Sequence, residues 1–267
     1  MTEDRAVTMT ERSPIAIVQA RMGSTRLPGK IMKPLAGKPV LWHVVDRLGH
    51  SHKLKDIVIA TTVTPEDDVV ADFCRERNIR YFRGSELDVL DRYYQAATFF
   101  RADPVVRITA DCPVIDPVIV DELIEEFFEG TYDVFAHGGE FPDGLDCEMF
   151  SFRVLEDAWK NADLPSEREH VGPYMRKHPE KYKIGAYEKF SGLAHHRWTL
   201  DEESDLMFLE KIYDRLYSEG TIFSTSDILA LLEAEPELAE INSDITRNEG
   251  YLKSLAEDKQ YLQVKRR

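Results

Sequence analysis

The strongest constraint on the fold is an alternation of short apolar runs with amphipathic stretches. Four apolar runs resemble buried strands, at 15–19, 57–60, 81–82 and 105–108. Apolar residues recur at helical spacing in 40–48, 69–74, 89–97 and 123–128. Strands that alternate with helices in this way form a mostly parallel sheet covered on both faces. The sequence therefore predicts an α/β domain.

The pattern becomes mixed after residue 131. It predicts further strands at 133–136, 147–152, 183–186 and 196–200, and helices at 154–162 and 169–177. Such a region adds antiparallel strands and a small mixed lobe over the edge where open α/β sheets bind ligands. We expect residues 203–267 to be largely helical and residues 1–13 to form a flexible tail.

One loop stands out by its charge. The chain has a formal net charge of −15, yet residues 14–45 contain several Lys and Arg residues and no Asp or Glu. Within this segment, Gly23 and Gly29 allow backbone amides to approach an anion, and the flanking strand and helix form the usual frame of a phosphate cradle. The loop is therefore predicted to bind a triphosphate, with Arg21, Arg26 and Lys30 supplying positive charge.

Other common phosphate-binding motifs do not match. Five residues separate Gly23 from Gly29, where a P-loop has four, and Ile31 stands where a P-loop needs Ser or Thr. A dinucleotide-binding GxGxxG is missing after the first predicted strand. The acidic composition disfavours a nucleic-acid partner, and no apolar stretch is long enough to span a membrane. We expect a cytoplasmic protein with its three cysteines reduced.

Residues 20–30 read Ala-Arg-Met-Gly-Ser-Thr-Arg-Leu-Pro-Gly-Lys. This segment resembles the N-terminal signature of the acylneuraminate and 3-deoxy-manno-octulosonate (Kdo) cytidylyltransferases, above all the branch named after spore coat polysaccharide biosynthesis protein F. Further matching segments follow in order at 58–62, 82–84, 88–92, 107–113, 144–148, 168–171, 198–201, 205–206 and 248–251. The resemblance implies a GT-A-like nucleotidyltransferase fold that uses CTP and Mg²⁺ and releases pyrophosphate. Thr62 replaces an Asp that many relatives carry, so the role of that Asp is not transferred.

The loop chemistry and the resemblance together assign the nucleotide and metal residues. The nucleotide-binding candidates are Ala20, Arg21, Gly23, Ser24, Arg26, Lys30, Thr61 and Arg83, and the catalytic candidates are Lys30, Arg21 and Asp111. Asp111 follows a predicted central strand, and Asp201 matches a metal ligand of the Kdo enzymes, so both are candidate Mg²⁺ ligands. Asp205 remains an alternative ligand or a charge in the first turn of a helix.

Six residues are candidates for binding the acceptor: Arg92, His137, Asp146, Glu148, Arg168 and His170. Arg168 is suited to clamp an acidic group, and His170 or Glu148 to remove a hydroxyl proton. Each has a structural alternative as a solvated charge, an ion pair or a core histidine. Arg92, for example, can pair with Asp88 four residues earlier on a helix.

The expected protein is a cytidylyltransferase that couples CTP to an acidic acceptor of the nonulosonic or octulosonic acid type, for surface polysaccharide or glycoconjugate synthesis. We expect residues 14–267 to form one domain, with a nucleotide-binding half (14–130), an acceptor and dimerisation lobe (131–202) and C-terminal helices (203–267). The relatives suggest a homodimer. Use of another nucleotide or of a phosphorylated acceptor by an enzyme of the same fold remains open. A GT-A glycosyltransferase is a second alternative, although residues 111–113 lack the Asp-x-Asp typical of that class. A non-catalytic nucleotide-binding protein is a third.

Overall fold

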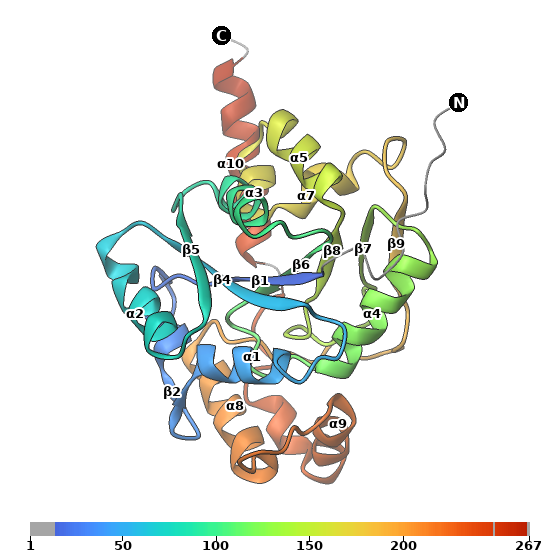
Figure 1. Cartoon of the computed structure of the whole chain (residues 1–267). Coiled ribbons are helices and arrows are strands. Elements are labelled where there is room, and N and C mark those ends of the chain that lie inside the picture. The colour runs from blue at the N-terminus through green and yellow to red at the C-terminus, as the bar shows by residue number, and fades with distance from the viewer. Residues whose placement is uncertain (1–13, 248, 266–267) are drawn as a thin grey trace.

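The structure is a computed structural model that describes residues 14–247 and 249–265 (Figure 1). The flexible tail expected at 1–13 lies outside the described residues, as does Asn248 of the last matching motif. Where the structure describes the chain, no helix is long and apolar enough to cross a bilayer.

A seven-stranded sheet forms the centre of the molecule, in the order β5-β4-β1-β6-β8-β7-β9. The strands are β1 (Ile15–Gln19), β4 (Asp56–Thr62), β5 (Arg80–Gly84), β6 (Val105–Thr109), β7 (Val134–His137), β8 (Glu148–Phe150) and β9 (Ile184–Tyr187). β1 pairs in parallel with β4 and β6, whereas β8 is antiparallel to both of its neighbours. A separate hairpin joins β2 (Pro34–Leu35) to β3 (Lys38–Pro39). The mostly parallel sheet is confirmed.

Helices cover both faces of this sheet (Figure 1). They are α1 (Val40–Leu48), α2 (Asp68–Glu76), α3 (Val89–Phe100), α4 (Pro117–Glu129), α5 (Phe152–Asn161), α6 (Pro165–His170), α7 (Gly172–Arg176), α8 (Glu203–Leu216), α9 (Thr225–Ala234) and α10 (Glu249–Lys265). Short 3₁₀ turns lie at Lys30–Met32, Pro65–Asp67 and Pro236–Glu240. α3, α5 and α7 lie on one face, and α1, α4, α8 and α9 on the other.

Two predicted elements are wrong in detail. The strand expected at 196–200 is only an isolated bridge between Asp143 and Arg197, because the partner segment bends at Gly144, whose φ is 107°. Gly144 packs against the backbone of Trp198 and Thr199, where a Cβ would clash. The helix expected at 169–177 is two short helices, because Val171 adopts φ 66° between α6 and α7. Val171 is buried, so a β-branched side chain is held in a left-handed conformation by its surroundings.

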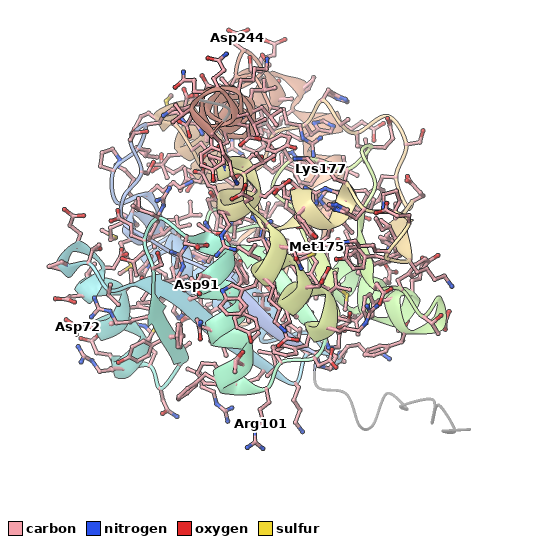
Figure 2. The ribbon with its side chains drawn as sticks, turned by 90° about the horizontal axis from the view of Figure 1, so that it is seen from above. Asp72, Asp91, Arg101, Met175, Lys177 and Asp244 are labelled. Atoms are coloured by element: carbon pink, nitrogen blue, oxygen red, sulfur yellow. The ribbon has the colours of Figure 1, made fainter. Side chains whose placement is uncertain are left out.

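Each face of the sheet has its own apolar core. Along β1, Ala16 and Val18 belong to the core under α1 and α4, whereas Ile15 and Ile17 belong to the core under α3 and α5. This division follows from the alternation of side chains along a strand. Figure 2 shows the helices of the second face from above, where Trp159 of α5 donates a 2.8 Å hydrogen bond to Asp91 of α3.

The parallel pairing of β1 with β6 determines where the loops after these two strands lie. Because β1 and β6 are parallel neighbours in register from Ile15 to Gln19, their carboxyl ends lie at the same edge of the sheet. Open α/β sheets bind ligands at this edge. The basic loop after β1 and Asp111 after β6 therefore lie together, although many residues separate them in the sequence.

Candidate active site

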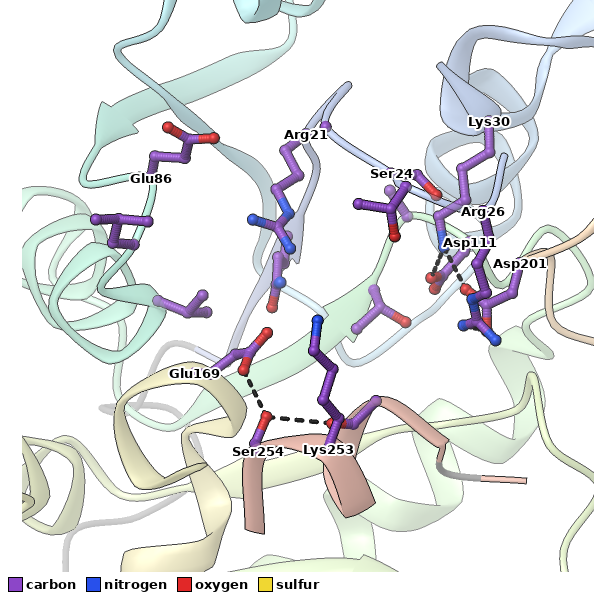
Figure 3. A pocket seen from close by; sticks show the side chains of 18 of the residues that line it. Arg21, Ser24, Arg26, Lys30, Glu86, Asp111, Glu169, Asp201, Lys253 and Ser254 are labelled. Carbon is purple, nitrogen blue, oxygen red and sulfur yellow. Dashed lines mark hydrogen bonds and ion pairs between the residues drawn. The ribbon is translucent and has the colours of Figure 1, made fainter. Parts of the chain in front are cut away.

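A cavity of about 840 Å³ opens at the carboxyl edge of β1 and β6. The loop after β1, the turn after β6, α6, and the first turns of α10 form its walls. The structure brings eight of the predicted site residues to this cavity: Arg21, Gly23, Ser24, Arg26, Lys30, Asp111, Arg168 and Asp201. Figure 3 shows Lys30, Asp111 and Asp201 meeting at one side of the cavity.

Local hydrogen bonds shape the basic loop. The amides of Ser24 and Gly29 both donate to the carbonyl of Met22, at 2.8 and 3.1 Å. The Ser24 hydroxyl accepts from the Leu27 amide at 3.2 Å. Gly29 adopts φ 69°, a left-handed conformation that strains other residues, and a Cβ there would also lie 3.2 Å from Met22. This turn starts the 3₁₀ helix that carries Lys30.

Lys30 bridges two carboxylates that come from distant parts of the chain. Its Nζ atom lies 2.5 Å from Asp111 Oδ2 and 2.7 Å from Asp201 Oδ1. Burial opposes the charge on Lys30, but the two carboxylates outweigh burial and raise its pKa. Burial likewise opposes ionisation of Asp111, but Lys30 outweighs it and lowers the pKa of that carboxyl. Lys30 and Asp111 are therefore both held charged.

The two carboxylates fit the donor set that Mg²⁺ requires. Their oxygen atoms converge on a single point, where the Lys30 ammonium sits. Mg²⁺ prefers oxygen ligands and retains several waters or phosphate oxygens, so two protein carboxylates suffice. Among residues 14–247 and 249–265, no group of three or more His, Cys, Asp or Glu side chains is arranged to hold a metal ion. Any Mg²⁺ here would take its remaining ligands from water or from a bound substrate.

Asp205 cannot share this role, because its oxygens are already occupied. It is fully buried and accepts two hydrogen bonds from Arg197, both 2.9 Å long. It also accepts from the backbone amides of Asp201 and Glu202, at 2.9 and 3.0 Å, and from Asn242. Asp205 therefore anchors the start of α8 and holds Asp201 at the cavity wall. The structure favours Asp201 over Asp205 as the second metal ligand.

Three predicted nucleotide residues lie away from the cavity wall. Ala20 and Thr61 are buried, and Arg83 donates to the carbonyls of Thr62 and Thr64, at 2.8 and 2.9 Å. Arg83 also pairs with Asp68 at 2.7 Å. These contacts tie β5 to the loop after β4, so the side chain of Arg83 has a structural role in this state.

The predicted acceptor residues are mostly engaged elsewhere. Arg168 lines the cavity, but its guanidinium pairs with Asp88 and donates to the Trp159 carbonyl at 2.8 Å. The alternative pairing of Asp88 with Arg92 is therefore wrong. Arg92 is fully buried beneath the cavity wall and donates to the Ser85 carbonyl. Within the described residues, its Nε and Nη2 atoms have no hydrogen-bond partner.

The remaining acceptor candidates form internal pairs outside the cavity lining. His137 Nε2 lies 3.1 Å from Asp146 Oδ1, and Glu148 pairs with Arg176 and, at 3.5 Å, with Arg107. Burial opposes the charge on His137, but Asp146 outweighs it and raises its pKa. Burial also opposes ionisation of Asp146, but His137 outweighs it and lowers that pKa.

A seam between α6 and α10 was not predicted. His170 of α6 meets the hydroxyl of Ser254 at 3.0 Å, and Ser254 donates to Glu169 at 2.6 Å. Polar residues that line the cavity without having been predicted include Gln19, Thr25, Glu86, Thr109, Glu169, Glu249, Lys253, Ser254 and Glu257. Glu169 lies inside the matching segment 168–171 and was within reach of sequence reasoning. The α10 residues lie in a charged helix whose sequence gives no sign of its partner.

Comparison with known proteins finds several related sequences. A sequence model described as cytidylyltransferase matches residues 15–249. An uncharacterized protein of Methanocaldococcus jannaschii is 35% identical, with 86% of this chain and 95% of that protein covered. Spore coat polysaccharide biosynthesis protein SpsF of Bacillus subtilis is 33% identical, with 84% and 95% covered. A 3-deoxy-manno-octulosonate cytidylyltransferase of Lawsonia intracellularis is 32% identical, but over only 47% of this chain and 51% of its own length.

Solved structures show the same fold. A cytidylyltransferase from Leptospira borgpetersenii superposes with a TM-score of 0.81 at 31% identity, covering 88% of this chain and 99% of that structure. A CMP:2-keto-3-deoxy-manno-octonic acid synthetase complexed with CTP superposes with a TM-score of 0.57, covering 77% and 100%. At 16% identity, the second likeness concerns the fold alone.

Proposed function

This chain belongs to the cytidylyltransferase family, and from that premise we propose that it transfers CMP from CTP to an acidic sugar-like acceptor, with release of pyrophosphate. The family identifies the chain as a nucleotidyltransferase. The observation that carries the proposal is the convergence of Lys30, Asp111 and Asp201 beside the basic loop. An acceptor of the nonulosonic or octulosonic type is supported by the relative named for 3-deoxy-manno-octulosonate, and a place in polysaccharide synthesis by the relative named SpsF.

The reaction requires positioning and charge neutralisation more than covalent chemistry by the protein. An acceptor hydroxyl oxygen attacks the α-phosphorus of CTP, the bond from that phosphorus to the bridging oxygen breaks, and pyrophosphate leaves with the electron pair. The hydroxyl proton passes to a base or to water. Arg21, Arg26 and Lys30 would hold the phosphate oxygens and offset the charge that develops on the leaving group.

Lys30 would change partners during binding. In the structure its ammonium neutralises Asp111 and Asp201. A triphosphate entering the loop offers the same ammonium a stronger concentration of negative charge. Once Lys30 turns to the phosphates, the two carboxylates would be free to hold Mg²⁺, which when bound supplies positive charge to the phosphate oxygens. Lys30 thus links occupation of the loop to availability of the metal site.

Pyrophosphate release over a matrix of nucleotides and acceptors tests this function. We expect release with CTP, but not with ATP, GTP or UTP, when N-acetylneuraminate, 3-deoxy-manno-octulosonate or a related acid is present. Release should stop on chelation of divalent cations, and Asp111→Asn should lower turnover across a Mg²⁺ titration. Release with another nucleotide, or with glucose 1-phosphate in place of an acid, would overturn the proposed substrates. Normal turnover of the Asp111 variant would overturn the metal assignment.

The proposal extends to assembly and location. By analogy with its relatives, the protein would form a homodimer and act in the cytoplasm, where CTP is available. Light scattering during gel filtration tests the first point, since a dimer has twice the 30.8 kDa mass of the chain. A mass equal to that of one chain at micromolar concentration would contradict it.

A further inference from the structure

Five cationic side chains line the cavity, and three of them pair with carboxylates. Arg26 lies 3.0 Å from carboxylate oxygens of Asp201 and Glu249, Lys30 bridges Asp111 and Asp201, and Arg168 pairs with Asp88. By contrast, the side chains of Arg21 and Lys253 make no hydrogen bond or ion pair within the part of the chain that the structure describes. Both charged groups are therefore available to a ligand in the cavity.

These two unpaired cations face each other across the cavity. Figure 3 shows Arg21 extending from the loop after β1 and Lys253 extending toward it from α10 on the opposite wall. The carboxylates of Glu86, Glu169, Glu249 and Glu257 also line the cavity and repel an anion. The two cations therefore mark the part of the cavity where an anionic group is best accommodated.

The helix that carries Lys253 is fixed in place. Asp258 of α10 is buried and accepts from the backbone amide and the hydroxyl of Ser166, at 2.9 and 2.6 Å. One turn earlier, the buried Ser254 donates to Glu169 of α6 at 2.6 Å. Buried polar groups are costly to leave unpaired, so these contacts hold α10 against α6. Lys253, next to Ser254, is thereby aimed into the cavity while its own ammonium remains free.

The position of Lys253 in the cavity suggests which anion it meets. Arg21, Arg26 and Lys30 come from the loop that is proposed to hold the triphosphate, whereas Lys253 extends from α10 on the opposite wall (Figure 3). A triphosphate held by the loop leaves the space beside α10 for the second substrate. Lys253 is therefore placed to contact the acceptor.

We propose that Lys253 binds the acidic group of the acceptor, so that α10 contributes to acceptor specificity. The inference rests on the proposed function for the presence of an acidic acceptor. The chemistry that it requires, an ammonium donating to a carboxylate, is a charge-assisted hydrogen bond within a partly enclosed space.

Binding to the CTP-loaded protein tests this inference without requiring turnover. Calorimetry would measure the Kd of N-acetylneuraminate and of 3-deoxy-manno-octulosonate, and separately the Kd of CTP, in wild type, Lys253→Ala and Lys253→Arg. For Lys253→Ala we expect the Kd of at least one acid to rise about tenfold. The arginine variant should restore most of the affinity, and the Kd of CTP should stay within about twofold. Lys259→Ala is a matched control, because Lys259 is exposed on α10 and does not line the cavity.

Three results would overturn the inference. An unchanged Kd for both acids would make Lys253 an ordinary surface lysine, and a raised Kd for CTP alone would assign it to the triphosphate. Failure of both acids to bind the wild-type protein would remove the acidic ligand altogether. The proposed function is judged separately. Acid binding without pyrophosphate release would refute the proposed reaction but not the role of Lys253. Pyrophosphate release that Lys253→Ala leaves unchanged would refute the role of Lys253 but not the proposed reaction.

Discussion

Replacing Lys30 by alanine should strengthen Mg²⁺ binding to the free protein and weaken CTP binding. In the structure a metal ion can reach Asp111 and Asp201 only by displacing an ammonium that contacts them at 2.5 and 2.7 Å. Hydrogen bonds to charged groups are worth about 1.5–3 kcal/mol each. Even if rehydration of the ammonium recovers half of the sum, the remaining cost of roughly 1.5–3 kcal/mol corresponds to a tenfold to hundredfold lower metal affinity in wild type.

The assay is calorimetric titration of Mg²⁺, and then of CTP, into wild type and Lys30→Ala. We expect the alanine variant to bind Mg²⁺ about ten times more tightly without nucleotide, and CTP at least about ten times more weakly. Lys33→Ala serves as control, since Lys33 lies 4.0 Å from Glu203 and contacts neither carboxylate. Unchanged or weaker Mg²⁺ binding by Lys30→Ala would refute the idea that Lys30 competes with the metal.

Two further predictions concern stability and titration. Asp205→Ala removes a fully buried carboxylate and leaves its donors on Arg197, Asn242 and the start of α8 without that acceptor, so it should lower the free energy of unfolding in urea by about 3–5 kcal/mol. The equivalent change at Asp227, in an exposed capping box on α9, should cost about 1 kcal/mol. Equal losses would show that the buried pair adds nothing. The raised pKa of His137 and lowered pKa of Asp146 imply that their pair stabilises the fold most between about pH 4 and 6.5, and the contribution falls as pH rises through the histidine pKa or drops through that of the carboxyl. Asp146→Asn should lower the pKa of His137 in an NMR titration, and an unchanged value would contradict the pairing.

Much of the fold was predictable because it depends on local patterns. Buried parallel strands such as β1 and β6 are continuous apolar runs, and the helices between them have apolar residues at helical spacing. The same logic located Asp111, since the end of a central parallel strand lies at the ligand-binding edge. Asp201 came instead from the family resemblance, because its place beside Asp111 depends on a contact between distant segments.

The parts that escaped prediction depend on partners far along the chain. Arg168 looked like a free clamp for an acceptor, but Asp88 occupies its guanidinium. The strand expected at 196–200 failed because an apolar run needs a neighbouring strand, and the segment near Asp143 supplies only one bridge. For α10, polar contacts such as that of Asp258 with Ser166 determine its position, and such contacts leave no periodic signal in the sequence.

The residues that line the cavity are synthesised at different times during translation. Arg21 and Asp111 are translated early, whereas Lys253 is translated 142 residues after Asp111. At about 5–20 residues per second, roughly seven to thirty seconds separate these events on the ribosome. A nascent chain can thus complete its phosphate loop long before α10 docks on α6. During that interval a chain still being made could hold a nucleotide but would lack one wall of the chamber in which the second substrate is received.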